Sequence, residues 1–305
     1  MSMRYPAGFI SAFYNPLKNP DAPTIGTASA ISGGISVAFT APSNVGGSAI
    51  TSYTATARRT SDGVLFTASG ASSPITISGL TQVAFTATVI AVNSYGPSVS
   101  SAASNSVTPL PTVGDAYQGG YFAGQISTAG NSIADYNLVV SPLSTGQTTP
   151  VQWKTNTTGG DPSSVIDGPT NSSTMNSATY PAANFCEALT IGGFTDWYMP
   201  AKNELEVCYY NLKPATTANN TTVGTNANAV PARASNYTLS IPAQTSAAAF
   251  QSGGAQYFSN AFYWSSTQYS NSTGSVQSFS TGFQTYSLKT NSSYRYVRAI
   301  RRVAV

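Results

Sequence analysis

Few side chains in this sequence could take part in chemistry: ten carboxylates, two cysteines and a small set of basic groups, with no histidine. The lack of an imidazole excludes Ser-His and Cys-His catalysis, histidine-ligated metals and histidine-based pH switches. Carboxylate, thiol or lysine chemistry remains, and each needs groups that meet in a shared cleft. The spacing of the acids therefore decides which reactions the chain could perform.

The acids lie singly along the chain except for Glu204 and Glu206, which fall in a segment with helical spacing. On a helix only residues about three or four apart share a face, so these two carboxylates are expected to point in different directions. A two-carboxylate glycosidase site would then require the fold to bring distant acids together. We expect no catalytic residues and no cofactor, and we interpret the chain as a protein that is not an enzyme.

Metal and disulfide sites are also scarce. Cys186 and Cys208 are too few for a cysteine zinc site, and they leave two alternatives, a single disulfide between two helices or a pair of buried thiols. Asp161 and Asp167 share a loop, which leaves calcium as a minor alternative there, because calcium takes several oxygen ligands including carboxylates. For the chain as a whole we expect no metal.

Composition limits the partners of the chain. Its 305 residues predict about two domains, and a hydrophobic content of 41% is enough for two cores. The net charge of +3 does not indicate nucleic-acid binding, and no apolar stretch is long enough for membrane insertion. With only 8% charged residues, solubility depends on Ser, Thr, Asn and Gln, which favours an extracellular particle.

Residues 1–21 predict an extended N-terminal docking arm, because they are rich in proline and show no hydrophobic period. The candidate docking residues are the aromatic ones: Tyr5, Phe9, Phe13 and Tyr14. Pro6 and Gly8 interrupt the apolar run, so the segment does not resemble a secretion signal. Release by host lysis, as part of a virus particle, is a route that needs no such signal.

Residues 22–109 read as short strands separated by Gly, Ser, Asn and Pro clusters, a pattern that predicts a β-sandwich. Alternating apolar positions predict strands at residues 35–39, 50–57, 75–77 and 84–92.

Three segments of this region, residues 37–42, 77–81 and 85–98, resemble strands of a fibronectin type III domain. The chain departs from that family at Phe39, where tryptophan is usual, and at Phe85, where a corner tyrosine is usual. Both substitutes are large and apolar, so the resemblance still implies that fold. Modules of this family most often act as spacers.

Prolines 109 and 111 predict a short, stiff linker at residues 110–114. All three tryptophans lie beyond it, in a second domain at residues 115–305. Helical spacing of apolar residues predicts helices over residues 177–189 and 202–212, within sequence that otherwise reads as strands and loops.

Ordered sequence blocks of the second domain carry a second resemblance. They are Asp196-Trp197 and Pro200 between the two helices, Tyr263-Trp264-Ser265-Ser266 after a long loop, and Tyr296-Val297-Arg298-Ala299 near the end. This order resembles the C-type-lectin-like domain at the C-termini of bacterial collagen-like adhesins and of phage fibres. The two resemblances together imply a mostly β protein with an α+β second domain, in which a fibronectin-like β-sandwich precedes a C-type-lectin-like head.

The second resemblance also implies structural roles for four residues. Trp197 and Trp264 are expected in the core, Asp196 as a capping or paired acid, and Arg298 bonded to backbone. The calcium-dependent sugar-binding signatures of animal lectins are absent from the sequence.

Residues rich in Tyr, Asn and Gln near the C-terminus are the candidate ligand-binding residues: Tyr269, Asn271, Gln284, Tyr286, Asn291 and Tyr294. Tyrosine offers wide contact area with few rotors, and asparagine offers adaptable hydrogen bonds, as in antibody paratopes. The alternative is that these residues form only the polar face of an antiparallel hairpin.

We interpret the chain as a phage virion accessory, fibre or decoration protein at the virion surface, extracellular after host lysis. The arm would bind other virion structural proteins, and the lectin-like head would bind the host surface or a glycan. A homo-oligomer is expected, because linked contacts gain avidity. The alternatives are a bacterial cell-surface adhesin and a structural capsid or tail decoration protein without ligand.

Overall fold

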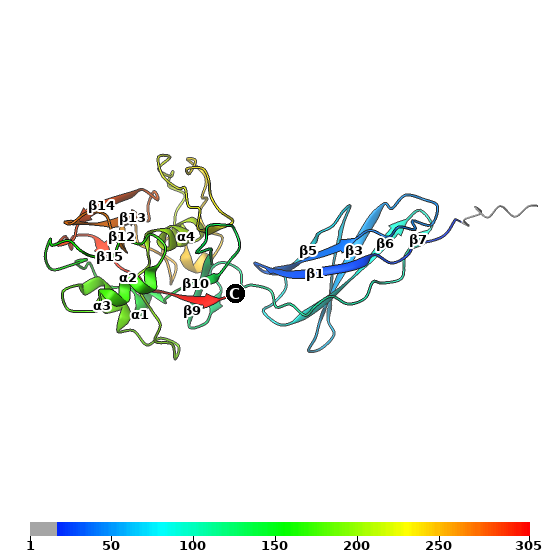
Figure 1. Ribbon diagram of the computed structural model, residues 1–305, viewed down its shortest axis with the longest axis horizontal. Helices are drawn as coiled ribbons and strands as arrows, with labels where there is room; N and C mark the ends of the chain where they lie inside the picture. Colours follow the sequence, from blue (N-terminus) through cyan, green and yellow to red (C-terminus); the bar gives the residue numbers. More distant parts are fainter. Residues whose placement is uncertain (1–16) are drawn as a thin grey trace, which may run out of the picture. The chain divides into compact units, whose positions relative to one another are not determined.

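The computed structural model describes residues 17–305, and the chain falls into two compact units, Met1–Pro111 and Thr112–Val305. In Figure 1 the first unit is blue to cyan and the second runs from green to red. Most of the regular structure is β-strand, which confirms the mostly β class. The predicted docking residues Tyr5, Phe9, Phe13 and Tyr14 lie outside the described residues.

The first unit is a sandwich of two sheets. Its strands are β1 (Thr24–Ile31), β2 (Gly34–Thr40), β3 (Ser52–Arg59), β4 (Leu65–Gly70), β5 (Ile75–Ser78), β6 (Phe85–Asn93) and β7 (Gly96–Pro97). One sheet has the order β1-β2-β5 and the other β4-β3-β6-β7, with antiparallel pairing throughout. Every second side chain of β3 and β6 is buried, because a strand turns successive residues to opposite faces. The four strands predicted from alternation are all present, and β1, β4 and the short β7 join them.

Both phenylalanines that replace the usual fibronectin residues lie in the core of this sandwich. The ring centroids of Phe39 and Tyr53 are 4.7 Å apart, and those of Phe85 and Phe66 are 5.8 Å apart in an edge-to-face arrangement. Such ring pairs add to the stabilisation from apolar burial. Large apolar residues therefore preserve the core at these two positions.

Serines at every third position cover the open edge of β6. The backbone N–H groups of Ser98, Ser101 and Ser104 donate to carbonyl oxygens of β6. Their hydroxyl oxygens accept N–H groups from the same β6 residues at 2.9 to 3.0 Å. The backbone groups of β6 are thereby satisfied without a full partner strand. The sequence pattern did not predict this arrangement, because a period of three is typical of neither a strand nor a helix.

The second unit combines two sheets with short helices. Its elements are β8 (Ala116–Tyr117), β9 (Gly120–Ile126), β10 (Tyr136–Val140), α1 (Leu143–Gly146), α2 (Gly168–Thr174), α3 (Pro181–Glu187), α4 (Lys202–Leu212), β11 (Ala229–Val230), the 3-10 turn η1 (Ala248–Phe250), β12 (Phe262–Gln268), β13 (Thr273–Ser278), β14 (Gln284–Leu288), β15 (Arg295–Tyr296) and β16 (Ile300–Ala304). One sheet has the order β11-β9-β10-β16, with β8 on β9, and the other β14-β13-β12-β15. β9 and the last strand of the unit, β16, thus flank β10.

The two predicted helices are present, one of them shortened. α4 spans the predicted residues, and the Glu204 carboxylate accepts the backbone N–H of Ala201 at 2.8 Å, which satisfies a donor at the start of the helix. α3 begins at Pro181 and not at Ser177, because proline suits the first helical position. No helix within residues 17–305 combines the length and apolar character that a membrane crossing requires.

The structural roles expected in the second unit are also present. Trp197 and Trp264 are almost fully buried in one apolar cluster. Arg298 is buried and donates to backbone carbonyl oxygens at 2.7 to 3.0 Å. Asp196 accepts two hydrogen bonds from Arg301, at 2.7 and 2.9 Å, a two-point pairing that fixes the orientation of the guanidinium group.

Candidate ligand-binding surface

Two tyrosines from separate strands stack on the surface of the second unit. Tyr269 follows the end of β12, and Tyr286 lies in β14, the edge strand of the same sheet. Their ring centroids are 4.3 Å apart and their planes differ by 8°. Tyr286 lies opposite Ser275 of the intervening β13, a small residue that leaves room for the rings. More than half of each tyrosine is exposed, so the pair presents an aromatic surface to solvent.

A shallow hollow of about 190 Å³ lies at this pair, and its lining residues are Lys202, Tyr269, Ser275, Gln284, Thr285 and Tyr286. Gln284 and Tyr286 share a face of β14, because residues two apart in a strand point the same way. Lys202 is the first residue of α4 and was not predicted to reach this surface. The hollow therefore combines an ammonium group, an amide and two aromatic rings.

The structure brings three of the six predicted ligand-binding residues together in this hollow: Tyr269, Gln284 and Tyr286. The other three lie outside its lining. Asn271 is exposed in the turn after β12. The side-chain amide of Asn291 donates to the Ser287 hydroxyl of β14 and accepts the backbone N–H of Ser293. Tyr294 is 76% exposed. The sequence pattern thus found the surface but not its boundary.

Two buried ammonium groups hold the turn that follows Tyr269. Lys289 Nζ donates to Asp161 Oδ2 at 2.5 Å, and also to the Gln268 side chain and the Asn271 carbonyl, each at 2.8 Å. Lys154 Nζ donates to the second oxygen of Asp161 at 2.8 Å. One carboxylate and two lysines therefore tie residues 154–161 to residues 268–271. Nothing in the spacing of these residues along the sequence signals that they meet.

The charge state of Asp161 follows from these contacts. Burial would raise the pKa of Asp161, but hydrogen bonds from Lys154, Lys289 and Tyr180 outweigh it and bring the pKa below its usual value. The group is therefore an ionised carboxylate at neutral pH, and both of its oxygens are taken by these donors.

The calcium alternative at this loop is not supported. Asp161 is held by lysine, and Asp167 instead accepts the backbone N–H of Thr170 and caps the start of α2. Across residues 17–305, the His, Cys, Asp and Glu side chains form no cluster that could hold a metal ion.

The two acids of α4 have different partners, as their spacing predicts. Glu204 accepts Arg302 Nε at 2.7 Å, whereas Glu206 pairs with Arg233 and accepts the Tyr237 hydroxyl at 2.6 Å. Both carboxylates are fully buried. They stabilise the fold around α4 and do not form a carboxylate pair in a shared cleft.

Of the two alternatives for the cysteines, the structure has the pair of buried thiols: Cys186 and Cys208 are both free. Cys186 of α3 packs in the cluster that contains Trp197, and Cys208 of α4 packs in a separate cluster of the core. Burial raises the pKa of both thiols. They act as small apolar core residues.

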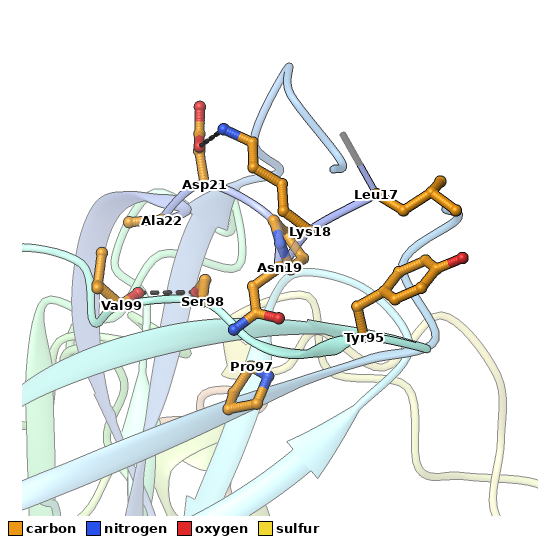
Figure 2. A pocket seen from close by; sticks show the side chains of 10 residues that line it. Leu17, Lys18, Asn19, Asp21, Ala22, Tyr95, Pro97, Ser98 and Val99 are labelled. Carbon is orange, nitrogen blue, oxygen red and sulfur yellow. Dashed lines mark hydrogen bonds and ion pairs between the residues drawn. The ribbon is translucent and has the colours of Figure 1, made fainter. Parts of the chain in front are cut away.

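A wider hollow of about 760 Å³ lies in the first unit, along residues 17–22 and Tyr95 to Val99. Figure 2 shows Leu17 and Tyr95 at one end of it, and the exposed pair of Lys18 and Asp21 at the rim. Its two charged groups pair with each other, so it lacks the convergent free polar groups of a ligand site. The hollow beside Tyr269 and Tyr286 is the stronger candidate.

Several solved structures resemble part of this chain. The titin kinase with its flanking domains is 23% identical with a TM-score of 0.27, over 30% of this chain and 17% of that chain. The twitchin kinase region from C. elegans is 23% identical with a TM-score of 0.29, over 36% of this chain and 21% of that chain. A human fourth FNIII domain is 20% identical with a TM-score of 0.29, over 37% of this chain and 96% of that chain. This chain thus spans less than a quarter of the titin and twitchin kinase chains.

No curated protein matches the chain. Residues 144–301 match the family of Lcl C-terminal domains. The match covers just over half of the chain and contains Lys202, both stacked tyrosines and the buried cluster around Asp161. The chain belongs to the Lcl C-terminal domain family, which is of the C-type-lectin-like, adhesin type.

Proposed function

We propose that the second unit is a recognition domain that attaches its carrier to a surface through the hollow beside Tyr269 and Tyr286. Membership of an adhesin-type, lectin-like family supports this role. The observation that carries the proposal is the stacked tyrosine pair, exposed at a sheet edge beside Lys202. Rigid aromatic side chains give contact area at a low entropy cost on binding. We assign no catalytic step to the protein.

The ligand proposed for this hollow is a saccharide. One face of a sugar ring is a row of C–H groups, which packs against an aromatic ring such as that of Tyr286. Sugar hydroxyls both donate and accept, and so match the amide of Gln284 and the hydroxyl of Ser275. The ammonium group of Lys202 favours a sugar with an acidic substituent.

The proposed carrier is a phage particle. Residues 1–21 would dock on other structural proteins of the particle, the first unit would act as a spacer, and the second unit would face the host from the virion surface. Several copies in one particle would gain avidity, because a second linked contact is effectively intramolecular. The proposal includes neither nucleic-acid binding nor membrane insertion.

A bacterial cell-surface adhesin is the second candidate carrier, and the adhesin type of the family favours it. The arm separates the two carriers experimentally. A chain without residues 1–20 should remain folded but be missing from purified phage particles. Normal incorporation of the truncated chain would contradict the docking role of the arm, and absence of the unmodified chain from the particles would contradict the phage assignment.

A glycan array with the full chain tests the recognition role. The variant Tyr269→Ala/Tyr286→Ala should lose roughly tenfold or more in affinity for the bound glycans, because anchor residues dominate contact energy. Tyr294→Ala is the matched control, since it removes an exposed tyrosine outside the hollow. If both variants bind the glycans as well as the unmodified chain does, the hollow beside Tyr269 and Tyr286 is not a ligand site. The second unit would then be a decoration at this surface.

A further inference from the structure

We propose that the outer edge of β14 is a self-association surface, at which two copies of this chain pair their β14 strands in antiparallel orientation. β14 ends the sheet order β14-β13-β12-β15 (Figure 1), and within residues 17–305 its only strand partner is β13. An edge strand presents a row of backbone N–H and C=O groups that can pair with another strand. The contact would continue the sheet of one copy into the sheet of the other.

The hydrogen bonds to β13 show which backbone groups of β14 face outward. The Ser278 N–H donates to the Phe283 carbonyl at 2.9 Å, and the Lys289 N–H donates to the Ser272 carbonyl at 3.0 Å. The register between these two bonds is regular. In an antiparallel ladder, residues that bond to the partner strand alternate with residues that do not. The outward-facing backbone groups are therefore those of three residues: Gln284, Tyr286 and Leu288.

These outward-facing groups are almost all open. Within residues 17–305 only the Leu288 carbonyl has a partner, the Asn291 N–H at 2.9 Å. A carbonyl oxygen has two lone pairs, so this one can accept a second hydrogen bond. The edge thus offers three donors and three acceptors to another strand.

β14 lacks the features that protect edge strands from pairing with other chains. Charged side chains, proline and bulges are the usual ones. Residues 283–288 contain no charged residue and no proline, and no bulge interrupts their pairing with β13. Other edges differ: Pro97 lies in β7, Arg295 lies in β15, and the Asn105 side chain bonds to both backbone groups of Ala28 in β1.

A second copy fits this edge because the edge is complementary to itself. In antiparallel pairing centred on Tyr286, this residue faces its own counterpart, and Gln284 faces Leu288 of the other copy. Each pair then joins two outward-facing residues, which exchange two hydrogen bonds. The segment carries no charge that would repel the same segment of the other copy.

The exposed side chains of β14 support the same contact. Tyr286 and Leu288 are 52% and 53% exposed, and they share a face because residues two apart in a strand point the same way. Aromatic side chains that face each other across two strands stabilise the pair. The stacked rings of Tyr269 and Tyr286 from both copies would form one aromatic row. Pairing in the plane of the sheet would leave both hollows open on that face.

Sedimentation velocity of the full chain tests for the association. A single strand pair buries less area than the interface of a stable dimer, so the contact should be weak. We expect a change from monomer to dimer as the concentration rises from about 1 µM to about 1 mM.

Two double variants test the register of the pairing. Gln284→Lys/Leu288→Lys places like charges opposite each other at both ends of the contact, and it should weaken dimerisation roughly tenfold. Gln284→Glu/Leu288→Lys changes the same two positions but places opposite charges there, so it should dimerise at least as strongly as the unmodified chain. Tryptophan fluorescence of both variants checks that the second unit is folded.

Amide hydrogen exchange, followed by nuclear magnetic resonance, locates the contact within the strand. The amides of Gln284, Tyr286 and Leu288 should exchange more slowly as the concentration of the chain rises. Those of Thr285 and Ser287 are the internal control. They face β13 and should be protected at every concentration.

Three results would overturn the self-association surface. One is a chain that stays monomeric up to about 1 mM, and another is a dimer that the two double variants affect equally. The third is protection of the Gln284 and Tyr286 amides in the monomer, which would assign the edge to a segment of the same chain. None of these measurements uses a glycan, so failure here and failure of the proposed function are distinguishable.

Discussion

The two units differ in where they place their charged side chains. The described ion pairs of the first unit, Lys18 with Asp21 and Arg59 with Asp62, lie at the surface. Every ion pair of the second unit buries at least one partner almost completely. A chain with only 8% charged residues thus concentrates its charges inside one of its units.

The difference follows from how each unit satisfies its backbone. The first unit is built from strand ladders, which pair N–H and C=O groups internally. Much of the second unit between β10 and β12 is irregular, so side chains must supply the partners. There Lys213 donates to the Pro242 carbonyl and Arg298 to the Ser141 carbonyl. Lys289 donates in the same way to the Asn271 carbonyl in the turn after β12. Single charges are therefore structural in the second unit and dispensable in the first.

The largest expected effect is that of Asp161→Asn on the second unit. The amide cannot neutralise Lys154 and Lys289, so two buried ammonium groups lose their carboxylate. Breaking a buried pair in this way costs about 3–5 kcal/mol of unfolding free energy. All three tryptophans lie in the second unit, so tryptophan fluorescence during denaturant unfolding follows that unit alone.

Asp62→Asn is the matched substitution in the first unit. It removes the surface pair with Arg59, and an exposed pair contributes about 0–1 kcal/mol. Calorimetry should show little change in the transition of the first unit. Similar losses from Asp62→Asn and Asp161→Asn would contradict the difference between the units.

Acid should weaken the second unit through Asp161. The folded-state pKa of Asp161 lies below its unfolded value of about 3.8, so the unfolded state binds the proton first. This stabilisation is complete above about pH 5 and is lost as the pH falls through the folded pKa, by up to about 1.4 kcal/mol per pH unit. Fluorescence-monitored unfolding should show this slope in the unmodified chain. If the unfolding free energy of Asp161→Asn has the same dependence on pH, the acid sensitivity belongs to other groups.

A smaller effect is expected from Ser101→Ala in the first unit. The substitution removes the hydroxyl that accepts the buried N–H of Val89 at 3.0 Å. A buried donor left without an acceptor costs about 1–3 kcal/mol. The midpoint temperature of the first unit's calorimetric transition should fall accordingly. The unfolding of the second unit, followed by tryptophan fluorescence, should be unchanged. No loss of stability would mean that water replaces the hydroxyl at the edge of β6.

Local sequence patterns predicted much of the fold. Four strands of the first unit were predictable because alternation depends on neighbouring residues, and the helix at residues 202–212 because its apolar spacing is regular. The start of α3 was missed by a few residues, although Pro181 was a visible signal.

The candidate site was only partly predictable. Tyr269 and Tyr286 stood out by residue type, but their stacking depends on strand register, which composition does not give. Lys202 and the partners of Asp161 are distant in sequence and meet only through tertiary structure.

The central claim, that recognition belongs to the tyrosine surface of the second unit, is tested most directly by comparing Tyr286→Ala with Tyr95→Ala. The two tyrosines are 52% and 48% exposed, and each lines a hollow in its own unit. Neither substitution should change unfolding free energy by more than about 0.5 kcal/mol. Affinity for the best array glycan should fall roughly tenfold or more in Tyr286→Ala and stay unchanged in Tyr95→Ala. Equal affinities of the two variants would contradict the claim.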